Sequence, residues 1–142
     1  MRNFCAFLVL LALPLAAEKK VISPPEFAGG TANFSPGILV DGTLYVSGQI
    51  GQDLKTKQVP ADFETEVKTL LSNIGIVLKA AGMTYKDVVS VQVYLTDMDL
   101  FPRMNAVYTT FFPDPRPSRT TVGVTKLAAA AAHIEITVTA KK

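Results

Sequence analysis

Four segments of the chain alternate apolar and polar residues with a period of two, which is the pattern of a β-strand that buries one face. The apolar parity consists of Leu44, Val46 and Ile50; Val89, Val91, Val93 and Leu95; Val122 and Val124; and Ile134, Ile136 and Val138. A sheet with one apolar face is stable only when that face packs against another layer. The alternation therefore predicts a sheet whose apolar parity faces helices.

Two segments between these strands supply the helices. Apolar residues recur at helical spacing from Asp62, a candidate N-cap, to Gly82, a residue typical of helix ends. A second helical pattern covers residues 100–111, with Pro102 tolerated in its first turn. The alanine run at 128–132 is too short for an isolated helix, and we expect a loop there.

A tight hairpin begins the pattern. Asp41-Gly42 lies between residues 38–40 and 43–47 and readily adopts the positive φ angles of a type I′ turn. The last two strands are expected at 119–124 and 134–140. The order is then hairpin, helix, strand, helix, strand, strand, in a chain long enough for one hydrophobic core. These features predict a single α+β domain with both helices on one face of the sheet.

The N-terminal segment has the layout of a secretory signal peptide. Arg2 precedes an unbroken apolar run at 4–13, and small residues end at Ala17. An uncleaved membrane anchor is the alternative, but the run is well short of the roughly 20 apolar residues that a membrane span needs. We therefore expect residues 1–17 to be removed and residues 18–142 to form the mature domain. The protein should be exported, periplasmic or secreted, with no stable membrane anchor after cleavage.

Composition excludes several kinds of site. The one cysteine, Cys5, lies in the signal segment, so the mature domain should form no disulfide and carry no thiol nucleophile. The one histidine, His133, cannot build a multi-histidine metal site, and we expect it to be structural. Loss of Arg2 with the signal leaves 13 basic and 12 acidic residues. A net charge near +1 gives little attraction for nucleic acid.

The polar parity of the predicted strands is almost free of charge. It consists of Thr43, Tyr45, Ser47 and Gln49; Ser90, Gln92 and Tyr94; Arg119, Thr121 and Gly123; and Glu135, Thr137 and Thr139. Only Arg119 and Glu135 among these are charged, whereas a sheet face bathed in water usually carries several lysines and glutamates. A second copy of the chain is the simplest cover for such a face. The alternative is that small polar residues merely favour β-structure.

Arg119 and Glu135 form the candidate site. They lie on consecutive strands and would be almost opposite each other if those strands pair as a hairpin. The pair could be a structural ion pair at a subunit interface. Alternatively, the arginine could grip a small carboxylate through two parallel hydrogen bonds while the glutamate orients or deprotonates a water. The second interpretation predicts binding and hydrolysis of a small acid.

Four segments also resemble a known family. They are Val46-Ser47-Gly48-Gln49-Ile50, Asn105 to Phe112, Pro117 to Val122 and Ile134-Glu135-Ile136. In order and spacing they are similar to the Rid family of reactive-intermediate deaminases, also called the YjgF family, over residues 21–142. The resemblance implies a chorismate-mutase-like (bacillus-type) domain with a mixed sheet, which assembles as a homotrimer with pockets between subunits.

The same resemblance implies an activity and a set of site residues. The activity is hydrolysis of reactive 2-imino acids of the 2-iminobutanoate and 2-iminopropanoate type, or their enamine tautomers, to 2-oxo acids and ammonia, without metal or organic cofactor. Arg119 would anchor the substrate carboxylate and Glu135 would position the attacking water. The residues that would complete or support the substrate-binding pocket are Phe34, Ser47, Gly48, Asn105 and Thr121.

The chain departs from the family pattern at three residues. Phe34 stands where deaminase-competent members commonly have a tyrosine, Thr121 replaces a frequent cysteine, and Thr137 replaces a frequent second glutamate. Phe34 removes a hydroxyl that could contact substrate or water, and the signal peptide is unusual for the family, so the natural imino acid stays open. Two alternatives to the deaminase are a non-catalytic trimeric protein that binds small carboxylates and a ribonuclease. The near-neutral charge and the lack of a basic-aromatic patch disfavour the ribonuclease.

Overall fold

The computed structural model describes residues 18–28 and 33–142. The predicted signal segment, with Cys5, lies outside the described residues. No helix in the described part of the chain is long and apolar enough to cross a membrane. Within the same ranges, no group of three or more histidine, cysteine, aspartate or glutamate residues could hold a metal ion.

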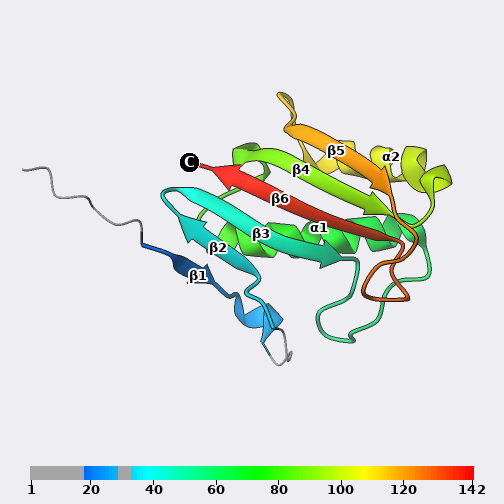
Figure 1. Ribbon diagram of the computed structural model, residues 1–142, viewed down its shortest axis with the longest axis horizontal. Helices are drawn as coiled ribbons and strands as arrows, with labels where there is room; N and C mark the ends of the chain where they lie inside the picture. Colours follow the sequence, from blue (N-terminus) through cyan, green and yellow to red (C-terminus); the bar gives the residue numbers. More distant parts are fainter. Residues whose placement is uncertain (1–17, 29–32) are drawn as a thin grey trace, which may run out of the picture.

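The fold is a single α+β domain in which two helices cover one face of a six-stranded sheet (Figure 1). The strands are β1 (Lys20–Ile22), β2 (Gly37–Val40), β3 (Thr43–Ile50), β4 (Val88–Leu95), β5 (Ser118–Gly123) and β6 (Ile134–Lys141). Their order in the sheet is β1-β2-β3-β6-β4-β5. Only the β4–β5 pair is parallel, so the sheet is mixed. The predicted fold class and the mixed sheet are confirmed.

The helices and the hairpin follow the local signals in the sequence. The longer helix, α1 (Phe63–Ala80), begins where the Asp62 carboxylate accepts a hydrogen bond from the Thr65 backbone N–H at 2.8 Å. The shorter helix, α2 (Phe101–Phe111), has Pro102 in its first turn. Asp41 and Gly42 have φ angles of 48° and 68° in the turn between β2 and β3. These φ values fit the expected type I′ turn.

The sequence patterns did not predict four short elements. One is strand β1, which pairs antiparallel with β2. The other three are single 3₁₀ turns, η1 (Pro25–Phe27), η2 (Tyr85–Asp87) and η3 (Met98–Leu100). Each is only three residues long, so none contains a full period of a hydrophobic pattern. The predicted loop at 128–132 is confirmed, since no helix or strand occurs there.

The core lies between the sheet and the helices, and most of the predicted apolar parity points into it. The confirmed members are Leu44, Val46, Val91, Val93, Leu95, Ile134, Ile136 and Val138, all at most 3% exposed. From α1 and α2, residues such as Leu70, Ile74 and Met104 fill the other side and are fully buried. Close packing of this layer fixes which face of each strand remains free.

Two register shifts reverse the parity predicted for Ile50 and Val89. Between Val46 and Gln49 the β3–β6 register shifts, and Gln49 then pairs with Ile136 on the helix side. Gln49 is consequently only 7% exposed, and Ile50 pairs with Glu135 on the opposite face. A second shift, between Val88 and Ser90, leaves Val89 49% exposed. An irregularity that adds one residue exchanges the two faces of a strand beyond it.

The predicted hairpin of the last two strands is wrong. Strand β6 inserts between β3 and β4, whereas β5 pairs in parallel with the outer edge of β4. Arg119 is therefore in register with Val91, which is buried on the helix side, and Val122 is in register with Tyr94 on the open face. Val122 is 41% exposed instead of facing the helices. The faces of β5 are the reverse of the prediction.

Candidate functional site

Two groups of predicted site residues form on opposite faces of the sheet. Arg119 and Thr121 lie on the helix side of β5, since their register partners Val91 and Val93 are both in the core. Glu135 lies on the open face, where its register partner in β4 is Tyr94. One chain therefore does not bring Arg119 and Glu135 together. The prediction that they face each other within the chain is wrong because β6 is not the neighbour of β5.

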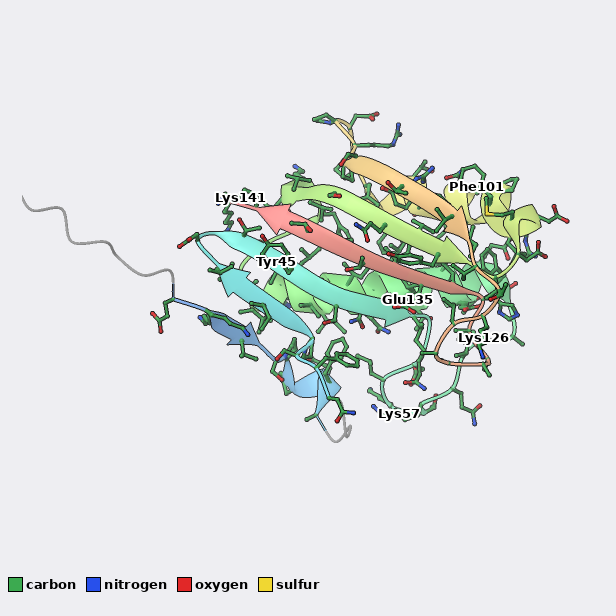
Figure 2. The ribbon with its side chains drawn as sticks, in the orientation of Figure 1. Tyr45, Lys57, Phe101, Lys126, Glu135 and Lys141 are labelled. Carbon is green, nitrogen blue, oxygen red and sulfur yellow. The ribbon has the colours of Figure 1, made fainter. Side chains whose placement is uncertain are left out.

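Aromatic rings of α2 hold the Arg119 side chain. Its guanidinium carbon lies 4.6 Å from the ring centroid of Tyr108 and 5.5 Å from that of Phe101, which Figure 2 labels. A guanidinium over a ring face is attracted by the ring quadrupole. The ion pairs within the described residues do not include Arg119. Its planar set of N–H donors is thus oriented by stacking, without a carboxylate from the same chain.

Two buried hydroxyls lie in the same group. The Tyr108 phenol and the Thr121 Oγ1 have no hydrogen-bond partner within the described residues. Burial raises the pKa of the Tyr108 phenol, and the nearby Arg119 and Arg116 charges act in the opposite direction. Tyr108 is 3% exposed, so its ring supports Arg119 from inside the core.

Asn105 joins this group from α2. It is half-buried and precedes Tyr108 by three residues, so the two side chains share one face of the helix. Phe101, four residues before Asn105, lies on that face as well. The structure therefore places Arg119 and Thr121 of β5, and the face of α2 that carries Asn105, at one edge of the sheet. Arg119, Thr121 and Asn105 offer hydrogen-bond donors, and none of the three is acidic.

Glu135 lines a hollow of about 400 Å³ on the open face. Its walls are Gly48, Tyr94, Val124, Lys126, Leu127, Ala128, Glu135 and Thr137. A Cβ atom at Gly48 would lie 2.0 Å from the Glu135 Oε1. Glycine at position 48 therefore leaves room for the carboxylate where it lies, and a larger residue would displace it. The carboxylate forms no ion pair with another described residue, so it can accept a proton or hold a water.

Ser47 and Phe34 lie near Gly48 and do not contact Arg119. The Ser47 hydroxyl donates a hydrogen bond to the Ser35 backbone carbonyl at 2.7 Å, which ties the segment before β2 to β3. Phe34 is 63% exposed and lines a neighbouring hollow of about 440 Å³ that shares Gly48 and also contains Gln49 and Asn73. Phe34, Ser47, Gly48 and Glu135 thus form the second group.

The beginning of β6 is fixed by a buried glutamate on α1. Glu66 is 0% exposed, and its Oε1 accepts the His133 backbone N–H at 2.7 Å. The Glu66 Oε2 lies 2.8 Å from the His133 Nδ1. The His133 carbonyl accepts the Thr96 backbone N–H at 3.0 Å. His133 is therefore structural, as predicted, and it is held two residues before Glu135.

Sequence reasoning missed three residues of these groups. Tyr108 belongs to the helical pattern at 100–111, and its spacing from Asn105 places it on the same helix face, where it supports Arg119. Tyr94 was assigned to the polar parity without a role. Lys126 lies in the loop after β5, where no periodic pattern exists, and only the three-dimensional path of that loop brings it beside Glu135.

Comparisons with known proteins place these features in context. A family model described as Endoribonuclease L-PSP matches residues 27–142. A 2-iminobutanoate/2-iminopropanoate deaminase of Rattus norvegicus is 40% identical over 110 residues, which cover 77% of this chain and 80% of that protein. The crystal structure of the YjgF gene product from E. coli has a TM-score of 0.80 at 28% identity, covering 87% of this chain and 98% of that one. The structure of E. coli TdcF with bound serine has a TM-score of 0.79 at 28% identity, with the same coverage.

Proposed function

Because the chain belongs to the Rid/YjgF (endoribonuclease L-PSP) family, we propose that it is a 2-iminobutanoate/2-iminopropanoate-type deaminase. One observation carries the proposal beyond family membership. The Glu135 carboxylate lines a hollow, has no ion-pair partner among the described residues, and lies over a glycine that leaves room for it. A carboxylate in that state is suited to act on water.

The reaction needs one water and no redox step. Water adds to C2 of the imine, and the imine nitrogen takes up a proton. The C2–N bond of the resulting tetrahedral intermediate then breaks as the carbonyl forms, so that R–C(=NH)–COO⁻ and H₂O give R–CO–COO⁻ and NH₃. Glu135 takes one proton from the attacking water and delivers it to the imine nitrogen. It then passes the hydroxyl proton of the tetrahedral intermediate to the same nitrogen as the C2–N bond breaks. Arg119 holds the substrate carboxylate through its planar fork.

The separation of Arg119 and Glu135 in one chain supports a site shared between subunits. We propose a homotrimer in which Arg119, Thr121 and Asn105 of one subunit complete the hollow that contains Glu135, Gly48, Ser47 and Phe34 of the next. The open face of the sheet carries exposed apolar and aromatic side chains that an adjacent subunit would cover. Val21, Tyr45 and Val122 are 54%, 52% and 41% exposed there. We also propose, from residues 1–17 alone, that the mature protein is exported.

An assay with freshly generated imino acid tests the proposed function. Purified protein should release 2-oxobutanoate and ammonia from 2-iminobutanoate faster than buffer does. An Arg119→Ala variant should lose most of this acceleration, because the substrate carboxylate then has no bidentate partner. Lys68→Met is the matched control, since Lys68 is an exposed cation on α1, away from the sheet's open face.

The result can also favour the binding-protein alternative. If 2-oxobutanoate binds to the protein but imine is hydrolysed only at the buffer rate, the chain is a carboxylate-binding protein and the deaminase proposal is wrong. If the Arg119→Ala variant hydrolyses imine as fast as the unmodified protein, the assigned anchor is wrong.

A further inference from the structure

The hollow around Glu135 contains a cation from the same chain. Lys126 lies in the loop between β5 and β6 and lines this hollow with Gly48, Tyr94, Glu135 and Thr137. Figure 2 shows Lys126 and Glu135 at the same end of the sheet, the lysine on the loop and the glutamate near the start of β6. An ammonium group is therefore available beside the proposed catalytic carboxylate.

Neither charged group forms an ion pair with another described residue. The three ion pairs within the described residues join Arg103 to Glu64, Arg116 to Asp114 and His133 to Glu66. Lys126 and Glu135 are thus not paired with each other, although they line one hollow.

The hydroxyls of the hollow, in contrast, already have partners. Tyr94 donates to the Gln92 Oε1 at 2.9 Å, and Thr137 donates to the Val46 carbonyl at 2.5 Å. The ammonium and the carboxylate are the charged groups left to meet a ligand.

Arg119 cannot be the cation of this hollow within one chain, because it lies on the other face of the sheet. In the proposed shared site, Arg119 of an adjacent subunit takes the carboxylate next to the imine carbon. Lys126 is then a second cation with no assigned ligand. The lysine ammonium is a compact point charge with three donors, which suits the carboxylate of a small acid.

We propose that Lys126 binds a second carboxylate at the far end of the substrate, so that dicarboxylic 2-imino acids are a substrate class of this protein. The inference rests on the proposed deaminase function and adds a specificity residue to it. A hollow of about 400 Å³ has the volume of a small-molecule site.

Binding of two 2-oxo acids to Lys126→Met and to the unmodified protein tests the inference. Methionine keeps an unbranched chain of similar length and removes the charge. Affinity for 2-oxoglutarate, which has a second carboxylate, should fall about 10- to 100-fold, the range for a hydrogen bond to a charged group. Affinity for 2-oxobutanoate, which has one carboxylate, should change less than about twofold. Lys126→Arg should restore most of the 2-oxoglutarate affinity because it keeps the charge.

Hydrolysis of the matching imines provides the second measurement. The Lys126→Met variant should lose kcat/KM for the dicarboxylic imine of glutamate and keep it for 2-iminobutanoate. Lys68→Met should leave kcat/KM unchanged for both substrates. Lys126 is exposed, so a thermal unfolding curve that matches the unmodified protein should accompany both variants.

Three outcomes would overturn the inference, and they differ in what else they affect. An equal loss of affinity for both 2-oxo acids would mean that Lys126 holds the carboxylate that they share, which is the one next to C2. Equal affinities in the variant and the unmodified protein would place Lys126 outside the site. Hydrolysis of 2-iminobutanoate without any action on the dicarboxylic imine would also reject the substrate class. None of these three outcomes contradicts the deaminase function. If the unmodified protein hydrolyses neither of the two imines, the deaminase function is overturned as well.

Discussion

Aromatic rings orient Arg119, and no carboxylate of the described residues forms an ion pair with it. A carboxylate partner from the same chain would occupy the guanidinium fork, whereas Tyr108 and Phe101 contact its face. Tyr108 is buried in the core, so the position of the ring is fixed by packing. A site for a small carboxylate benefits from this arrangement, because less conformational freedom is lost when the ligand binds.

Replacement of Glu135 by glutamine separates binding from turnover. Glutamine keeps the size and hydrogen-bonding capacity of the side chain but cannot accept a proton. We expect imine hydrolysis to fall about 100-fold or more, the usual scale of general-base assistance, while 2-oxobutanoate still binds through Arg119. Steady-state rates and ligand titration on one preparation provide both values. Unchanged turnover in a correctly assembled protein would show that Glu135 has no catalytic role.

The candidate residues were named from sequence motifs, whereas their neighbours follow only from the fold. Gly48 and Glu135 occur in separate motifs, yet the structure packs them so closely that a Cβ atom at position 48 would displace the Glu135 carboxylate. Arg119 was placed on the wrong face, because alternation in β5 does not reveal which parity is buried when both Thr121 and Val122 can occupy a strand. The aromatic support of Arg119 depends on the docking of α2, which is a tertiary contact.

At the scale of elements, the contact of α1 with the start of β6 positions the strand that carries Glu135. Replacement of Glu66 should therefore lower the free energy of unfolding more than replacement of a partly exposed glutamate of the same helix. Replacement of Glu66 by leucine removes the acceptor of the His133 N–H and should lower the free energy of unfolding by about 1–3 kcal/mol. Glu66→Gln, which keeps an acceptor oxygen, should cost less. Denaturant titration measures both.

Glu64 provides the matched control for this prediction. Its ion pair with Arg103 is partly exposed, with side-chain exposures of 34% for Glu64 and 48% for Arg103, and pairs at the surface contribute about 0–1 kcal/mol. Glu64→Leu should therefore change stability by less than about 1 kcal/mol. If Glu66→Leu and Glu64→Leu destabilise the protein equally, the buried contact does not fix β6.

The elements were predictable wherever a local rule governs them. The Asp62 cap, the Asp41-Gly42 turn and the helical spacing after residue 62 each act within a few residues, and all were confirmed. The strand order was not predictable in this way. Strand β6 pairs with β3, about ninety residues earlier, in preference to its neighbour in sequence. The two register shifts also carry no distinctive local pattern, and they reverse the faces of Gln49, Ile50 and Val89.

At the scale of the whole molecule, the placement of Arg119 and Glu135 on opposite faces makes a prediction about mixed assemblies. Arg119→Ala and Glu135→Gln variants should each be nearly inactive alone. When the two are unfolded and refolded together, some shared sites receive the intact arginine from one subunit and the intact glutamate from the next. Random assembly of equal amounts gives such a site about one time in four, so about a quarter of the original activity should return.

Light scattering on the refolded mixture should give the mass of a trimer. Mixing the two folded variants without exchange of subunits should restore nothing. If refolding together also restores nothing although the trimer forms, the two residues do not act in one shared site.

The central position of β6 has a consequence for synthesis of the protein. A nascent polypeptide that has reached residue 133 contains β3 and β4 but not the strand that joins them. It cannot close the core, however long the ribosome pauses, because Ile134, Ile136 and Val138 supply the middle of the buried face. Translation products that terminate before β6 should therefore be degraded by cellular proteases, and no shortened fragment should accumulate in a partly active form.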